Sequence, residues 1–320
     1  MRLSEHPEFE QAVIRAADHF STQGLRAAFI EKDYYVTEAL RTIAQVSGEK
    51  VIFKGGTSLS KGWNLIQRFS EDIDLFLDPQ AFTPPLGAKA IDRELKKLRD
   101  SIIESMHVTF LKDESRTFGG SGRNDWFNYD QKFGGQGEVL GRILLEAGIA
   151  SGREPIVTME LHSYLGQFLQ EAGVSLGADD EKPFSMQLLH FRRTFVEKMF
   201  AIHKRVELFK KNGLPIGSYA RHYYDLSQLA QREEVISMLK SGEYAEIKAD
   251  YDRISRTYFP DHYSYPADMS FANSEALFPS RELNEVIGAQ YHEQCKLLCY
   301  GPYPEWSKVI GQFEQLRTLL

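Results

Sequence analysis

The spacing of apolar residues divides the chain into a helical start, a mixed middle and a helical end. Between residues 6 and 46 they recur at helical spacing, with Gly24 in the break between two predicted helices. Short apolar runs at 51–54 and about 72–77 predict strands, because each is bounded by turn residues. The segment between them predicts a glycine turn and a short helix at about 58–67.

The middle of the chain combines further strands with one long helix. A proline-rich turn followed by a helix is predicted over 81–105. The segment 108–138 is rich in Gly, Asn, Asp and aromatic residues, which favours one or two strands with a long functional loop. Another strand is predicted within 155–164.

The last part of the chain is predicted to be largely helical. Helical spacing runs over 184–211, and Gly213 marks the expected end of this helix. A second helix is predicted over 217–242. The segment 255–280 is expected to be irregular before helix resumes toward the C-terminus.

This order of elements predicts an α+β fold with a mixed sheet core and flanking helices. Residues 1–180 are expected to form the α/β core with its helical lead-in, and residues 181–320 a mainly helical domain. The boundary is placed within 171–183, a polar stretch that contains glycine and proline.

Composition and charge limit the classes of partner. The chain has 320 residues, of which 42% are hydrophobic and 26% charged, as in ordinary globular proteins. The net charge is −7, whereas a general polyanion binder is more often basic. Any contact with nucleic acid must therefore come from a local patch.

The sequence also bears on the expected location of the protein. The first residues lack the layout of a signal peptide, and no apolar run approaches the roughly 18 residues that a membrane span needs. The two cysteines, Cys295 and Cys299, are four apart on one helical face, so a disulfide framework is not expected. We expect a soluble, cytoplasmic protein.

Two aspartates interrupt the apolar run near residue 75. Because side chains alternate along a strand, Asp72 and Asp74 share one face and the apolar Ile73 and Leu75 the other. The two carboxylates lie roughly 7 Å apart and repel each other, and a divalent cation would remove that repulsion. Hard oxygen ligands suit Mg²⁺, with Mn²⁺ as the substitute, so both residues are candidate metal ligands.

The glycine turn upstream is a candidate phosphate site. Gly55 and Gly56 would let the backbone approach a ligand closely, and N–H groups at a helix start attract phosphate. Thr57 or Ser58 can cap the helix or donate to a phosphate oxygen. A plain strand-to-helix turn is the alternative. The spacing around Lys61 does not fit a P-loop.

These motifs resemble those of a known family. "GGTS" followed by "SEDIDL" is similar to the signature of the nucleotidyltransferase fold of the DNA polymerase β superfamily. "IEKDYYVTEAL", "FKGGTSLSKGW", "RFSEDIDL", "VEKMFAIHKR" and "ARHYYDLSQL" resemble, in this order, the AbiEii/AbiGii-like toxins, which include the MenT-type nucleotidyltransferases. The resemblance covers about residues 28 to 230.

The resemblance implies transfer of a nucleotide from an NTP to an acceptor. For the toxin members it implies an RNA acceptor, with the tRNA 3′ end as first candidate, a block of translation, and a cognate antitoxin. Two alternatives stay open: the same chemistry on a small molecule or protein side chain, and a non-catalytic NTP-binding module.

The resemblance also implies site residues in the second half of the chain. It places Lys198 on the NTP phosphates, and Arg205 shares its helical face. Asp225 would orient Lys198 or bind the nucleotide, while a simple pair with Arg221 is the alternative.

Further candidates are less specific. Glu160, on a later predicted strand, would be the third carboxylate that superfamily members often supply, or else a solvent-facing residue. Ser70 would contact phosphate or form a turn, and Lys32 and Asp33 would support the site. Candidate RNA contacts on the basic helix and in the loop 116–133 are Arg192, Arg193, Lys210, Lys211, Arg116, Arg123, Trp126, Tyr129 and Lys132.

Overall fold

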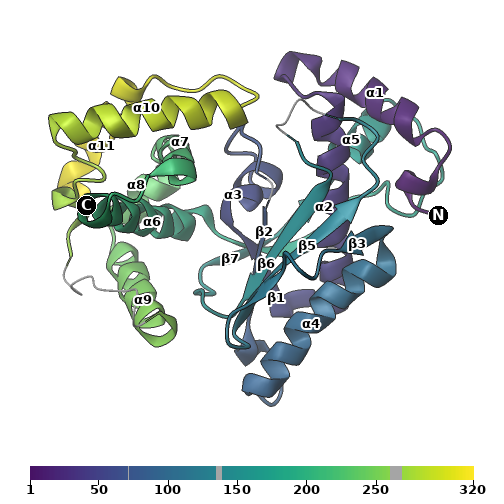
Figure 1. The fold of residues 1–320 in the computed structure, drawn as a ribbon, viewed down its shortest axis with the longest axis horizontal. Coiled ribbons are helices and arrows are strands. Elements are labelled where there is room, and N and C mark those ends of the chain that lie inside the picture. Colours follow the sequence, from purple (N-terminus) through teal and green to yellow (C-terminus); the bar gives the residue numbers. More distant parts are fainter. Residues whose placement is uncertain (71, 135–138, 260–268) are drawn as a thin grey trace. The chain divides into compact units, whose positions relative to one another are not determined.

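The structure is a computed structural model that describes residues 1–70, 72–134, 139–259 and 269–320 (Figure 1). It divides into two compact units. The sheet unit comprises Met1–Trp63, Phe69–Ile149 and Ile156–Leu189. The helical unit comprises Asn64–Arg68, Ala150–Pro155 and His190–Leu320. Position 71, just before Asp72, lies outside the described residues, as do parts of the predicted loop segment 108–138 and of the predicted irregular segment 255–280.

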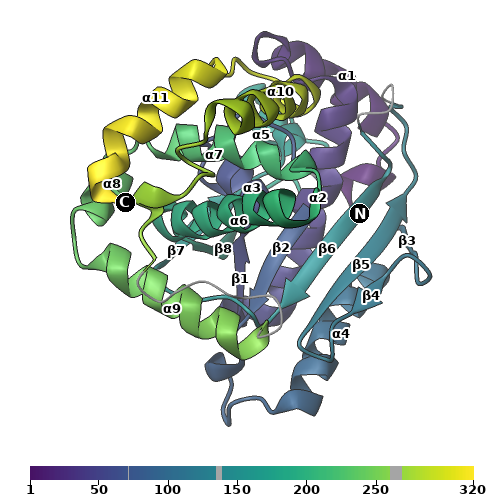
Figure 2. The same ribbon diagram turned by 60° about the vertical axis from the view of Figure 1, so that its left-hand side comes forward.

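The core of the sheet unit is one mixed sheet, in the strand order β3-β5-β6-β2-β1-β8-β7, with β4 paired to β5 (Figure 2). The pairs β1–β8 and β2–β6 are parallel and the others antiparallel, which confirms the predicted α+β class. The strands are β1 (Val51–Lys54), β2 (Asp72–Leu77), β3 (Val108–Phe110), β4 (Arg116–Thr117), β5 (Gly122–Tyr129), β6 (Arg142–Gly148), β7 (Ile156–Leu161) and β8 (Phe184–Leu189).

Two long helices cover one face of this sheet. α2 (Ala27–Ser47) and α4 (Ala88–Ser105) pack against β5 and β6, and Tyr35 stacks on Tyr129 with ring centroids 4.0 Å apart. We call this the helix face. Burying its apolar side chains supplies the driving force that holds sheet and helices together. The fully buried residues of this face include Ile73, Leu75, Phe127, Ile143 and Leu145.

Shorter helices complete the sheet unit. α1 (Phe9–His19) and α5 (Tyr164–Glu171) pack against α2, and Ser163 caps α5 by accepting from the Gly166 N–H at 3.0 Å. The single turn α3 (Gly55–Thr57) follows β1 and continues as a π-helical turn over Ser58–Gly62. The predicted short helix therefore begins and ends earlier than expected.

The helical unit packs around aromatic side chains. Tyr223 meets Trp306 edge-on at 5.1 Å, and Phe200 stacks on Tyr251 at 4.2 Å. Such ring pairs add stability beyond their buried area. The longer helices are α6 (Phe191–Asn212), α7 (Arg221–Leu229), α8 (Glu233–Leu239), α9 (Glu243–Tyr258), α10 (Arg281–Leu298) and α11 (Trp306–Leu316).

The predicted helix over 184–211 is wrong at its start. Residues 184–189 form β8, which pairs with β1 on one side and β7 on the other. α6 begins only after His190, whose Nδ1 accepts from the Arg192 N–H at 3.2 Å. The predicted boundary at residue 180 falls before this strand, whereas the compact units divide after Leu189. The single helix predicted over 217–242 is also divided, into a 3₁₀ turn, α7 and α8.

Two other expectations concern cysteines and membranes. Cys295 and Cys299 are free thiols, as predicted. Within the described ranges, no helix combines the length and apolarity that crossing a membrane requires.

Candidate active site

The aspartates of β2 lie on the sheet face opposite the helix face, which we call the site face. Asp72 and Asp74 are half-buried, while Ile73 and Leu75 between and beyond them are buried against the helices. The prediction that both carboxylates share one face is confirmed. The strand is therefore polar on this face only at its start, because Phe76 further along the same face is buried with Ile52 and Leu189.

A third carboxylate joins the pair from the neighbouring strand. β6 runs parallel to β2, and the register places Glu146 directly beside Asp74 on the site face. Burial, together with the negative charges of Asp74 and Asp72, raises the pKa of Glu146 to about 7. Asn124 of β5 donates from Nδ2 to Glu146 Oε1 at 2.6 Å, which fixes the orientation of the carboxyl group.

Lys54 completes this row of polar residues across four strands. It lies at the end of β1 opposite Asp74, and its charge opposes the rise in the pKa of Glu146. The row therefore runs from Asn124 through Glu146 and Asp74 to Lys54.

Glu160 does not lie with these carboxylates. It is exposed on β7, on the site face but three strands from β2, a separation of about 14 Å across the sheet. The register also places it four residues further along the strands than Asp74. Glu146, which the sequence reasoning missed, occupies the place expected of Glu160. The signal was present, since Glu146 is a single acidic residue within the apolar run "ILLEAG".

The donor set fits a hard divalent cation. In the described part of the chain, no group of three or more His, Cys, Asp or Glu side chains is placed to hold a metal ion by itself. Mg²⁺, however, is usually held by one or two carboxylates together with waters and substrate phosphates. Asp72 and Asp74, with Glu146 beside them, supply oxygen ligands of that kind.

Position 55 must be glycine because the Asp74 carboxylate lies against it. Its φ is +77°, in the left-handed region, and a Cβ built there would lie 1.9 Å from Asp74 Oδ2. No other residue type satisfies both the backbone and the space. The glycine therefore allows the backbone of the turn to lie in direct contact with the Asp74 carboxylate.

The two hydroxyl residues of the turn are used within the protein. Thr57 Oγ1 donates to the carbonyl of Asp72, and Ser58 Oγ donates to the carbonyl of Gly55 at 2.9 Å. Both side chains are buried. In this structure the two hydroxyl groups donate to backbone carbonyls, which stabilises the turn and its contact with β2. The predicted donation of these hydroxyl groups to a phosphate therefore has no support from the geometry. Ser70 is half-buried just before β2, and its role stays a prediction.

The block at 31–33 ties α2 to surrounding segments. Lys32 is buried and donates from Nζ to the carbonyls of Leu140, at 3.1 Å, and of Arg142, where β6 begins. Asp33 pairs with Lys61 of the π-helical turn at 2.6 Å. These contacts hold the start of β6 and the glycine turn to α2. The role of Lys32 and Asp33 in supporting the site stays a prediction.

In the helical unit, Lys198 belongs to a buried ionic cluster. Its Nζ lies 2.7 Å from Asp225 Oδ2, while Arg68 binds both oxygens of Asp225, at 2.6 and 2.8 Å. All three residues are buried. The ion pair with Lys198 is the contact expected if Asp225 orients that lysine. Arg68 was not predicted, because nothing in its local sequence indicates this partner.

The charges in this cluster are set by the balance of burial and pairing. Burial would raise the pKa of Asp225, but Arg68 and Lys198 outweigh it and hold that pKa well below its usual range. Burial lowers the pKa of Lys198 against the opposing effect of Asp225. Burial and Lys198 lower the pKa of His222 to about 3, so its neutral ring can accept from Lys198 Nζ at 3.2 Å.

The remaining basic residues of α6 are largely paired within the helical unit. Arg192 lies 3.3 Å from Glu243, Arg193 pairs with Glu197 and Asp250, and Lys210 with Glu207 and Glu275. Arg205 donates from Nε to the Pro215 carbonyl at 2.7 Å, with its guanidinium over Tyr219. These contacts reduce the positive charge that the helix can offer to RNA or to a triphosphate.

A mixed sheet with a glycine turn beneath paired carboxylates is the architecture of a nucleotidyltransferase. The family model for the nucleotidyl transferase AbiEii toxin of type IV toxin–antitoxin systems matches residues 38–305. The chain belongs to this family, which confirms the resemblance found in the sequence, and is a nucleotidyltransferase toxin of a toxin–antitoxin system. Membership implies an NTP substrate and a cognate antitoxin.

A solved structure shows the same fold. The chain is similar to MenT4, a nucleotidyltransferase toxin from Mycobacterium tuberculosis H37Rv, with a TM-score of 0.56 and 15% sequence identity. The match covers 95% of this chain and 88% of MenT4. No curated protein matches the chain.

Proposed function

We propose that the protein transfers a nucleoside monophosphate from an NTP to the 3′ end of an RNA, with tRNA as the first candidate, and so blocks translation. The observation that carries this proposal is the grouping of Asp72, Asp74 and Glu146 on one sheet face above the Gly55 turn. Three neighbouring carboxylates repel each other and a divalent cation would relieve this repulsion, so their grouping favours metal-assisted phosphoryl transfer.

Each group has a defined task in this reaction. The acceptor hydroxyl oxygen attacks the α-phosphorus, the bond to the bridging oxygen breaks, and pyrophosphate leaves while the hydroxyl proton passes to water. Mg²⁺ supplies charge neutralisation on the phosphates and a lowered pKa of the attacking hydroxyl. Asp72 and Asp74 would hold the ion, Glu146 would offer a further oxygen ligand beside Asp74, and Gly55 lets the turn lie against the Asp74 carboxylate.

Lys198 is the proposed contact for the triphosphate from the helical unit. A lysine held as a point charge suits a phosphate chain, and Asp225 fixes the position of the Lys198 ammonium group at 2.7 Å. Arg68 makes this arrangement rigid because it binds both oxygens of the same carboxylate. Because Asp225 is held in place, the Lys198 side chain is already ordered before the triphosphate binds. Less conformational entropy is then lost on binding.

The proposal is tested by incubation of the purified protein with total RNA and each of four α-labelled NTPs. We expect label in RNA with Mg²⁺ or Mn²⁺, loss of labelling with EDTA, and none with Asp72→Ala. The Asp72→Ala variant should keep its fold, since the side chain is only half-buried. Labelling of RNA by this variant, or labelling that persists without a divalent cation, would contradict the assignment.

A second acceptor class is favoured by one observation. The ion pairs of Arg192, Arg193 and Lys210 use much of the basic helix that was expected to meet RNA. If the acceptor is a small molecule or a protein side chain, the same labelled NTPs give Asp72-dependent label outside the RNA fraction. Nucleotide binding without transfer to any acceptor would instead support a non-catalytic module.

A further inference from the structure

Strand β5 places side chains on the site face beyond Glu146. Its residues Asn124 and Trp126 pair with Glu146 and Leu144 of β6, and these in turn pair with Asp74 and Asp72 of β2. Trp126 therefore lies in the same row as Asp72, two strands away. At the usual strand spacing this separation is about 10 Å, or roughly three base-stacking steps of 3.4 Å.

Trp126 is paired with an arginine on this face. The guanidinium of Arg142 lies over the half-buried indole ring, 4.7 Å from its centroid, and its Nη1 contacts Glu114 at 2.8 Å. The Arg142 side chain is 32% exposed, so the pair has an accessible outer surface. Unpaired bases stack on aromatic rings and on guanidinium planes, which makes this stack suitable for a nucleobase.

The register also separates the residues that the sequence grouped as base-stacking candidates. Arg123 and Tyr129 lie on the helix face and are buried, the first against Asp125 and the second against Tyr35. Trp126 lies on the site face, and Arg116 of β4 pairs with Asn124 in the row that contains Glu146. Neither Arg123 nor Tyr129 is thus placed to stack on a base.

We propose that the Trp126–Arg142 stack binds an unpaired nucleobase of the acceptor RNA, close to its reacting 3′ end. This inference rests on the proposed function. The acceptor is favoured over the donor NTP because the glycine turn follows β1, on one side of β2, whereas Trp126 lies on the other side of β2 beyond β6. A donor phosphate over Gly55 and an acceptor base over Trp126 would then approach the carboxylates from opposite sides.

The structure provides a matched control on the other face of the same sheet. Phe110 of β3 pairs with Phe127, which lies on the helix face, and Arg99 of α4 lies over its ring at 5.2 Å. Phe110 is half-buried, as is Trp126. Phe110→Ala therefore removes an aromatic–arginine pair of the same kind without touching the site face.

The experiment compares Trp126→Ala, Trp126→Phe and Phe110→Ala with the wild-type protein. Steady-state transfer gives the KM for tRNA and for NTP, and fluorescence anisotropy gives the Kd for a short labelled single-stranded RNA. For Trp126→Ala we expect the KM for tRNA and the Kd for the RNA to rise roughly 5- to 100-fold. The KM for NTP should stay within about twofold, Trp126→Phe should recover most of the affinity, and Phe110→Ala should resemble the wild type.

Several results would overturn the inference. An unchanged KM for tRNA and Kd in Trp126→Ala, or an increase in the KM for NTP alone, would show that the stack does not bind the acceptor. Loss of affinity in Phe110→Ala equal to that in Trp126→Ala would point to a general folding effect. Absence of Asp72-dependent labelling in the wild type would refute the proposed function instead, and the anisotropy measurement would still decide whether Trp126 binds RNA.

Discussion

At the scale of single residues, the contact between Gly55 and Asp74 connects the backbone to the chemistry of the site. The glycine is left-handed at φ +77°, and the space where a Cβ would lie is filled by the Asp74 carboxylate. The left-handed turn and a candidate metal ligand are therefore in direct contact. Any side chain at position 55 must displace the carboxylate, the turn or both.

We predict that Gly55→Ala lowers the transfer rate at least tenfold and the free energy of unfolding by about 1–3 kcal/mol. Gly48→Ala is the matched control, because Gly48 also has a positive φ of 53° but nothing lies within 4 Å of its built Cβ. Transfer assays and urea denaturation of both variants check this. Equal loss of rate in the two variants would mean that backbone strain, not the Asp74 contact, explains the effect.

The residue scale also shows what one sequence can predict about this site. The shared face of Asp72 and Asp74 depends only on alternation within one strand, so it could be predicted. Glu146 could not be placed beside them, because that contact depends on which strand pairs with β2 and in which register. The internal use of the Thr57 and Ser58 hydroxyls likewise depends on contacts that no motif records.

At the scale of elements, α6 and α7 are joined by the cluster of Arg68, Lys198 and Asp225. The three buried charges compensate one another while all are present, but removal of the shared carboxylate leaves two buried cations without their common counter-ion. Stability and function are therefore difficult to separate at Asp225. Lys198 is the better probe, because Arg68 still neutralises Asp225 when the lysine is absent.

We predict that Asp225→Ala lowers the free energy of unfolding by about 3–5 kcal/mol, with a clearly smaller loss for Lys198→Met. Lys198→Met should raise the KM for NTP about tenfold or more while the protein stays folded. Chemical denaturation and steady-state kinetics on both variants measure these effects. A folded Lys198→Met variant with an unchanged KM for NTP would remove Lys198 from the site.

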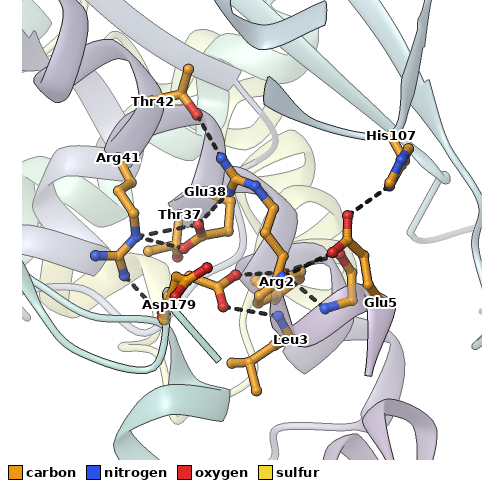
Figure 3. A network of polar contacts seen from close by, with 12 residues as sticks. Arg2, Leu3, Glu5, Thr37, Glu38, Arg41, Thr42, His107 and Asp179 are labelled. Carbon is orange, nitrogen blue, oxygen red and sulfur yellow. Dashed lines mark hydrogen bonds and ion pairs between the residues drawn. The ribbon is translucent and has the colours of Figure 1, made fainter. Parts of the chain in front are cut away.

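Helix α2 carries a second buried ionic group, shown in Figure 3. Glu38 is fully buried, and it accepts from Arg2 at 2.7 Å and from Arg41 at 2.9 Å. Arg41 also donates to the carbonyls of Asp180 and Lys182, so this group fastens the first residues and the segment before β8 to α2. Burial, with a smaller contribution from the negative charge of Asp180, raises the pKa of Glu38 to about 7 in spite of Arg41.

This raised pKa predicts a pH dependence of stability. The folded state holds the Glu38 proton more tightly than the unfolded state, whose pKa is near 4.5, so stability falls as pH rises from about 4.5 to about 7. Glu38→Gln cannot ionise and should lack this fall. We expect the wild type to lose about 1–3 kcal/mol relative to the variant between pH 5 and pH 7, measured by urea denaturation. Parallel curves for the two proteins would refute the assignment.

Among the elements, β8 is the strand that local sequence predicts as helix. Its residues precede a long amphipathic helix without a glycine or proline between them, and local spacing cannot separate six strand residues from the helix that follows. The choice is made by pairing, because β1 and β7 both offer backbone partners to this segment. Tertiary contacts of this kind override local preference.

At the scale of the whole molecule, one chain combines the fold of a nucleotidyltransferase toxin with a row of carboxylates on one face of its sheet. The AbiEii family model covers residues 38–305, which include the carboxylates of the site face and the buried ionic cluster of Lys198. The fold is shared with MenT4. The central claim is that Glu146, and not Glu160, is the third carboxylate of the site. Both are glutamates on the site face, so they can be exchanged for glutamine as a matched pair.

The most direct test is transfer of α-labelled NTP to total RNA by Glu146→Gln and Glu160→Gln, with circular dichroism as the check on folding. We predict that Glu146→Gln reduces the rate about 100-fold or more, as expected when a group that stabilises the transition state is lost. Glu160→Gln should retain a rate within about twofold of the wild type. A folded Glu146→Gln variant with a wild-type rate, or loss of transfer in Glu160→Gln alone, would contradict the account.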